Sequence, residues 1–270
     1  MSTRPQTQPM TLAELAELAS AGGDARSKSA WSCILRALGP GTPVVEVTTA
    51  TIARWVMAES RRLKPGTVNR RAQRLRTALK LAADLGIIET VPRVPSLKDR
   101  SARDRLCTPA ELETICGRCS PRVAYAVRVL YWSGLRRGEL CKLTWSQVDL
   151  HARMVRVHGC QAKNGKARSV PMPDRLVAIF FRWRQMDPDA PVIGLHPETV
   201  TRGFTRACRS AGIEDLRLHD LRHTALTRYR RKANCSIFVL AAIAGHSSVA
   251  TAARYQTVDD EDLRRVAGLI

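Results

Sequence analysis

Residues 89–105 read ETVPRVPSLKDRSARDR, and this stretch divides the 270-residue chain into two parts. It contains Pro92 and Pro95 and has almost no periodicity of apolar residues, which is typical of a linker. Helical patterns fill the residues before it, whereas the residues after it mix helical patterns with short strand patterns. The sequence therefore predicts a flexible N-terminus of residues 1–10, a domain of residues 11–88, a linker of residues 89–105 and a second domain of residues 106–270.

The first domain is predicted to be entirely helical. Thr11 and Glu14 form a capping-box pattern that opens a short helix. Apolar periodicity predicts further helices over residues 27–38, over residues 49–61 and from about Pro65 to Gly86. Beside the apolar stripe of the last helix lie Arg70, Arg71, Arg74 and Arg76. This basic face could contact phosphates, and the alternative is a solvated surface without a ligand.

The second domain is predicted to be mainly helical with a small antiparallel sheet. A capping box formed by Thr108 and Glu111 opens it, with Pro109 at the first helical position. The patterns predict helices over residues 109–117, 121–133, 174–185, 198–211, 219–232, 236–244 and 259–268, and strands over residues 148–150, 154–157 and 169–172. The expected fold class is thus mainly α, with an all-helical first domain and a mixed α/β second domain.

The charge of the chain indicates a polyanionic partner. Lys and Arg number 44 against 24 Asp and Glu, a formal net charge of +20. Residues 1–105 hold 18 basic and 9 acidic residues, and residues 106–270 hold 26 and 15, so both domains are basic. Arginine supplies 36 of the 44 basic residues, and its guanidinium suits bidentate contact with phosphate. Nucleic acid is the partner that this distribution favours.

Apolar patterning and cysteine placement favour a soluble cytoplasmic protein with no membrane partner. No apolar run approaches the roughly 18 residues of a membrane span. The first ten residues, MSTRPQTQPM, lack the apolar core of a secretory signal. The eight cysteines fall mostly within apolar-periodic segments, which predicts buried free thiols.

Two short segments place polar side chains where a plain core would not need them. In SGLRRGEL, residues 133–140, Arg136 directly follows a helix stop and could help to form an anion site; the alternative is an ion pair with Glu139 one turn on. In LHDLRH, residues 218–223, His219 and Arg222 share a helix face, so an imidazole could transfer a proton beside a bound anion.

Two other patterns resemble metal sites without completing one. His219 and His223 have the i, i+4 spacing of a zinc pair, but no third ligand follows at a suitable spacing. Cys116 and Cys119 form a CxxC pair without a second pair. We therefore predict no metal site.

An ordered set of motifs carries a resemblance to a known family. Arg136 lies in GLRRGEL, Lys163 in AKNGKARSVP, His219 and Arg222 in HDLR, His246 in AGHSS, and Tyr255 ends ATAARY. In this order the motifs are similar to those of the tyrosine recombinases, the phage-integrase and Xer family of site-specific recombinases. The resemblance covers about residues 106–270, and the helical domain before it resembles the core-binding domain with which this family clamps DNA.

The resemblance implies a chemical role for each matched residue. Tyr255 would attack a phosphodiester and form a 3′-phosphotyrosine bond, a reaction that needs neither ATP, a metal nor another cofactor. Arg136 and Arg222 would hold the phosphate oxygens as charge develops, and His219 would take the proton of the tyrosine.

The hairpin and the segment after HDLR supply the remaining roles. Lys163 would protonate the departing 5′-oxygen, with Lys166 as the rival proton donor and otherwise a DNA contact. His246 would donate to the phosphate. Among the arginines of the first domain, DNA contacts are expected from Arg70, Arg71 and Arg74.

The implied function is cutting and rejoining of double-stranded DNA that carries recombination sites. The active form would be a homotetramer on DNA, assisted by accessory or directionality proteins, and the last predicted helix would dock either on its own chain or on the neighbouring protomer. Three alternatives stay open: a non-catalytic DNA-binding accessory protein of the same fold, strand relaxation of the type IB topoisomerase kind, and a metal-dependent hydrolase.

Overall fold

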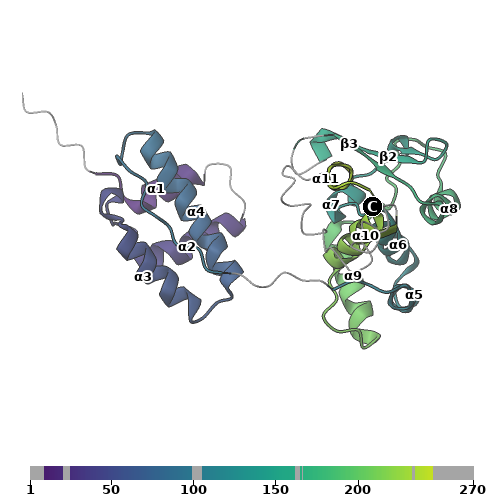
Figure 1. Ribbon diagram of the computed structural model, residues 1–270, viewed down its shortest axis with the longest axis horizontal. Coiled ribbons are helices and arrows are strands. Elements are labelled where there is room, and N and C mark those ends of the chain that lie inside the picture. The colour runs from purple at the N-terminus through teal and green to yellow at the C-terminus, as the bar shows by residue number, and fades with distance from the viewer. Residues whose placement is uncertain are drawn as a thin grey trace, which may run out of the picture. The chain divides into compact units, whose positions relative to one another are not determined.

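The computed structural model describes residues 9–20, 25–98, 105–161, 165, 167–232 and 235–245 (Figure 1). The chain forms two compact units, Met1–Arg103 and Asp104–Ile270. Both are mainly helical, and the second contains a small antiparallel sheet, which confirms the predicted fold class. None of the helices in these ranges has both the length and the apolar character needed to cross a lipid bilayer. The helix predicted over residues 259–268 lies outside the described residues.

The first unit is a bundle of helices packed around its longest member. Its elements are α1 (Leu12–Ala19), α2 (Ala25–Leu38), η1 (Val44–Glu46), α3 (Thr49–Ser60) and α4 (Pro65–Asp84). The helix α4 contacts α1, α2 and α3, because Val68, Leu75 and Leu79 form a fully buried stripe along it. The predicted capping box is present, since the backbone N–H of Thr11 donates to Glu14 Oε2 at 2.7 Å.

The second unit surrounds a buried helix, α6. Its helices are α5 (Pro109–Gly117), α6 (Pro121–Ser133), α7 (Arg137–Cys141), α8 (Asp174–Trp183), α9 (Pro197–Ser210), α10 (Leu218–Lys232) and α11 (Ile237–Ala244) (Figure 1). The helix α6 contacts α5, α8, α9 and α10, which explains why apolar residues occupy nearly all of its faces. Thr108 and Glu111 form the predicted capping box of α5. The five-residue helix α7 had no periodic pattern long enough to predict it.

The sheet of the second unit holds a hairpin against α11. Its strands are β1 (Val148–Asp149), β2 (Met154–Val157) and β3 (Arg168–Pro171), antiparallel in the order β1-β2-β3, with η2 (Trp145–Gln147) before β1 and η3 (Gly159–Gln161) after β2. Val155 pairs with Val170 and Val157 pairs with Arg168. The strand β3 begins at Arg168, one residue before the predicted start, and it contacts α11. This contact brings the root of the hairpin next to the end of α11.

Candidate functional site

Arg136 stands at the start of α7, where the chain leaves the buried helix α6. Gly134 turns the chain with φ +69°, a left-handed conformation that favours glycine, and Arg136 is the N-cap residue of α7. Its Nη1 donates to Glu139 Oε1 at 2.8 Å and its Nη2 donates to the carbonyl of Gly245 at 2.8 Å. The ion pair with Glu139 therefore exists, and it orients a side chain that remains 24% exposed.

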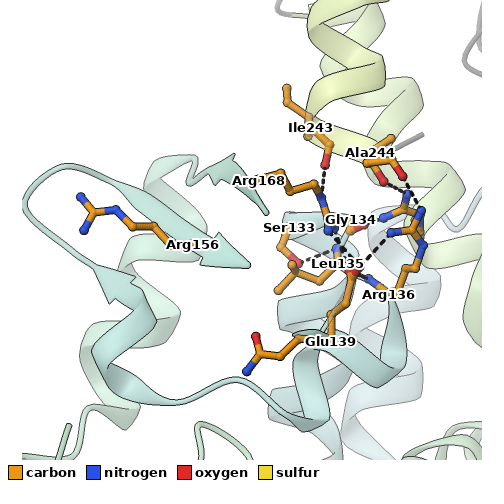
Figure 2. A network of polar contacts seen from close by, with 12 residues as sticks. Ser133, Gly134, Leu135, Arg136, Glu139, Arg156, Arg168, Ile243 and Ala244 are labelled. Carbon is orange, nitrogen blue, oxygen red and sulfur yellow. Dashed lines mark hydrogen bonds and ion pairs between the residues drawn. The ribbon is translucent and has the colours of Figure 1, made fainter. Parts of the chain in front are cut away.

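Glu139 is a buried carboxylate shared by two arginines. Arg136 donates to it through Nη1 and through its backbone N–H, which lies 2.7 Å from Oε2. Arg168 donates through Nη1 and Nη2, at 2.9 and 2.7 Å (Figure 2). Burial alone would raise the pKa of Glu139, but the hydrogen bonds from Arg168 and Arg136 outweigh it, so that its pKa is lowered and the group is ionised.

Arg222 and His219 reach the same region from α10. The side chain of Arg222 is buried, and it donates from Nη1 to the carbonyl of Gly134 and from Nη2 to the carbonyl of Ala244. His219 and Arg222 line one pocket of about 340 Å³ together with Arg137, Arg217 and Thr201. His219 and Arg222 therefore share a helix face, as predicted, and this face lines a pocket that is rich in arginine.

The electrostatic surroundings keep His219 neutral. The residue itself is exposed, yet loss of water around the ring and the neighbouring charges of Arg222 and Arg136 lower its pKa from the ordinary value of 6.5. A neutral imidazole can accept a proton, so His219 is electrically suited to act as a base.

The C-terminal end of α11 joins these side chains. Gly245 has φ +62° and ends the helix, and the carbonyls of residues 243, 244 and 245 accept hydrogen bonds from Arg168, Arg222 and Arg136 respectively. Figure 2 shows Arg168 and Arg136 beside Ile243 and Ala244 at the end of α11. The next residue in the chain is His246.

The remaining residues of the matched motifs lie outside the described residues. These are Lys163, Lys166, His246 and Tyr255. Of the predicted catalytic set, the structure brings together Arg136, His219 and Arg222. It places the flanks of the hairpin, β2 and β3, in the same unit.

The arginines of α4 differ in what they contact. Arg70 is exposed and donates to Thr67 Oγ1 at 3.1 Å, and Arg74 is half-buried. Arg71 forms an ion pair with Glu59 on α3. Arg70 and Arg74 are therefore better placed than Arg71 to meet a ligand at the surface.

Sequence reasoning missed Arg168 as part of this site and considered Glu139 only as a local partner of Arg136. One signal could have found Arg168. It lies two residues before the buried Val170 on the same strand, so both side chains point to the same face of the sheet. A charged residue on an inward face implies a buried partner of opposite charge.

The other sequence patterns do not gather into a site. In the described ranges, no three His, Cys, Asp or Glu side chains are grouped as metal ligands would be. All eight cysteines are free thiols, and burial raises the pKa of Cys116 to about 12, which keeps it protonated. A larger cavity of about 700 Å³ between α6 and α8 is lined by Tyr125, Trp132 and Trp183 and contains no residue of the matched motifs.

Comparison with known proteins identifies the family. The family model described as "Phage integrase family" matches residues 105–262, more than half of the chain. The chain therefore belongs to the phage integrase family. A tyrosine recombinase of Thermosipho africanus is 32% identical over 146 residues, which make up 51% of this chain and 50% of that protein. The chain spans about half the length of the first curated relatives it matches.

Solved structures share the fold along nearly the whole chain. The Tn1549 transposon integrase in complex with a circular intermediate DNA aligns with a TM-score of 0.77 and 20% identity, over 97% of this chain and 100% of that one. A lambda integrase tetramer bound to a Holliday junction aligns with a TM-score of 0.70 and 22% identity, over 92% of this chain and 82% of that one. At these identities the likeness shows the fold.

Proposed function

We propose that the chain is a site-specific DNA recombinase that cuts and rejoins duplex DNA through a 3′-phosphotyrosine intermediate. The observation that carries the proposal is that Arg136 and Arg222, from two segments far apart in sequence, converge on the end of α11, and that His219 shares a pocket with Arg222. These are the residue types that a phosphoryl transfer from DNA to a tyrosine requires, and they match the order of the family's motifs. Residues 11–88 act as the core-binding domain and residues 106–270 as the catalytic domain.

The arginines stabilise the phosphorane. As Tyr255 attacks, negative charge grows on the non-bridging oxygens, and the guanidiniums of Arg136 and Arg222 can donate forked hydrogen bonds to them. Both are already oriented by carbonyls of the protein, so no reorganisation is needed at the moment of reaction. Removal of one such preorganised donor costs about 10²–10³ in rate.

Proton transfer completes the reaction. A tyrosine has a free pKa near 10, so Tyr255 needs a base at neutral pH, and the lowered pKa of His219 supports that role. Lys163 on the β2–β3 hairpin protonates the departing 5′-oxygen, with Lys166 as its rival. His246 is the residue after Gly245, whose carbonyl accepts a hydrogen bond from Arg136. In the proposed reaction, His246 donates a hydrogen bond to the phosphate.

The basic surface supplies DNA binding. The net charge of +20 favours a duplex partner. The exposed Arg70, together with Arg74 and Lys166, contacts its backbone, whereas Arg71 supports this face through its ion pair with Glu59. The lambda integrase relative forms a tetramer on a Holliday junction, which supports a homotetramer on two recombination sites. Accessory proteins then set the direction of exchange, and the reaction takes place in the cytoplasm.

A covalent-trapping experiment tests the proposal. A pool of nicked duplexes with a randomised segment beside the nick is incubated with the full chain, and adducts that survive denaturing electrophoresis are sequenced. The nick lets the short 5′-hydroxyl fragment diffuse away, so the adduct accumulates. We expect an adduct on an enriched sequence, unchanged by EDTA and lost in Tyr255→Phe, which should still bind the duplex.

The alternatives predict other results. A non-catalytic accessory protein would bind the enriched duplex without forming an adduct. A type IB topoisomerase would relax supercoiled plasmids that lack the enriched sequence, whereas a recombinase needs two copies of it. A metal-dependent hydrolase would lose activity in EDTA.

A further inference from the structure

A buried ion pair between Arg168 and Glu139 has no role in the site described above. The side chains are 6% and 2% exposed, and two hydrogen bonds of 2.9 and 2.7 Å join them as a bidentate pair. The Nε of Arg168 also donates to the carbonyl of Ile243 at 2.9 Å. Burial of both charges costs free energy that a purely apolar contact would not, so this arrangement needs a reason beyond packing.

Arg168 is placed to act through other residues and not on DNA. Its Nη1 and Nη2 already hold both oxygens of a carboxylate and its Nε donates to the carbonyl of Ile243, so the fork that a backbone phosphate would need is occupied. Its partner Glu139 is the carboxylate that also holds the guanidinium and the backbone N–H of Arg136. Its other partner, Ile243, lies two residues before Gly245, whose carbonyl accepts from Arg136. Both restraints on the Arg136 guanidinium therefore depend on groups that Arg168 fixes.

The contact of Arg168 with Gly245 is close as well. A Cβ at Gly245 would lie 2.9 Å from Cδ, 3.0 Å from Nε and 3.2 Å from Cζ of Arg168. The guanidinium is thus packed against the backbone at the point where α11 ends. Arg168 opens β3, so one side chain ties the strand, the end of α11 and the carboxylate of α7 together.

We infer that Arg168 is a positioning residue of the recombinase reaction, which orients Arg136 through Glu139 and through the end of α11. The inference rests on the proposed function. Arg168 also shares the charge of Glu139, so that this carboxylate does not neutralise Arg136 alone. Loss of Arg168 would let Glu139 draw Arg136 away from the phosphate, and the rate of DNA cleavage would fall while the affinity for DNA stays almost the same.

The main test is single-turnover cleavage of the enriched nicked duplex at saturating protein, with the dissociation constant measured separately. For Arg168→Met we expect the cleavage rate to fall about 10- to 100-fold, as for other displaced catalytic groups, with DNA affinity unchanged within about threefold. Arg168→Lys, which keeps the charge but not the fork, should recover part of the rate. The matched control is Arg105→Met, because Arg105 forms a bidentate pair with Glu111 in the same unit without touching Arg136. It should cleave as the wild type does.

A double variant separates positioning from folding. Arg168→Met leaves Glu139 without its strongest partner, and the double variant Arg168→Met with Glu139→Gln removes that excess charge. If Arg168 acts through Glu139, the double variant should be more stable than Arg168→Met yet cleave no slower than the slower single variant. Additive losses in the cleavage rate would overturn the inference, because they would show that Arg168 does not act through Glu139.

A substrate with sulfur as the bridging 5′ atom distinguishes the step that is affected. A thiol ionises near pH 8.5, so its departure needs little protonation, unlike that of an alcohol. Because Arg168 acts through Arg136, sulfur should not rescue Arg168→Met. Full rescue would instead show that Arg168 supports the protonation of the leaving oxygen by the hairpin lysine, and it would overturn the inference. If the wild-type chain forms no adduct at all, the proposed function fails and this inference falls with it, whereas a wild-type adduct with unimpaired Arg168→Met refutes the inference alone.

Discussion

Replacement of Gly245 by alanine should damage the site more than replacement of a comparable glycine elsewhere. Gly245 has φ +62°, and an L-residue in this conformation costs about 1–2 kcal/mol. The new Cβ would also overlap Arg168 at 2.9–3.2 Å. That guanidinium is held by Glu139 and the carbonyl of Ile243, so it cannot swing aside freely, and overpacking of this kind costs about 1–3 kcal/mol more.

Gly212 provides the matched control in the same unit. Its φ is +66°, and apart from its chain neighbours no atom of the described residues lies within 4 Å of a Cβ built on it. Gly212→Ala therefore carries the conformational cost alone. Since 1 kcal/mol shifts the Tm of a unit of this size by about 2–4 °C, Gly245→Ala should melt about 2–12 °C below Gly212→Ala.

Scanning calorimetry of the full chain measures this difference, and the transition of the first unit serves as an internal reference because neither glycine belongs to it. The same proteins are tested for single-turnover cleavage of the enriched nicked duplex. Gly245→Ala should be slower by about tenfold, because Arg168 must move and Arg136 moves with it. Equal Tm values and equal rates for the two alanine variants would refute the reasoning.

Further predictions concern charge and protonation. His219 has a lowered pKa, so the acid limb of cleavage at limiting DNA should have its midpoint below pH 6.5. His219→Gln should be about 10²-fold slower and lack this limb, and an acid limb with its midpoint above pH 6.5 in the wild type would contradict the prediction. Glu139 has a lowered pKa in the folded state, so in acid the unfolded chain binds more protons, and the stability from Glu139 is present above pH 4.5 and lost as the pH falls. The Tm measured between about pH 3 and pH 6 should therefore vary less with pH in Glu139→Gln than in the wild type. An unchanged slope of Tm against pH would argue against an ionised carboxylate. Arg70→Gln should reduce the slope of log affinity against log salt by about 0.9, whereas Arg71→Gln should chiefly lower Tm by breaking the pair with Glu59; the reverse pattern would place the phosphate contact at Arg71.

Local interactions made much of the fold predictable. The capping boxes at Thr11 and at Thr108 join residues three positions apart, so the sequence alone contains both partners. The end of α6 is equally local, because Gly134 ends this helix in a left-handed conformation two residues before Arg136. By contrast α7 spans only five residues, too few for a periodic pattern, and it is held by the tertiary contacts of Glu139.

Predictability of the site follows the same rule. The spacing of His219 and Arg222 is set by one helix, and the structure places both at one pocket. Arg136 could be found from its motif, but its bond to the carbonyl of Gly245 spans 109 positions in sequence. Arg168 and Glu139 are 29 positions apart, and neither segment contains a pattern that predicts the packing of β3 beside α11. Their pairing follows from tertiary packing, which a pattern of single residues does not encode.

The end of α11 explains how cations can be gathered before any phosphate is present. Guanidiniums repel one another, but the C-terminus of a helix carries a partial negative charge of about −0.5, and the ionised Glu139 adds a full one. The carbonyls of Ile243 and Ala244 accept hydrogen bonds from arginines only because the helix stops at Gly245; in a longer helix they would accept the backbone N–H groups of the following turn. The glycine of the AGHSS motif is therefore as much a part of the cationic site as the charged residues, since it determines where the helix ends and leaves room for Arg168.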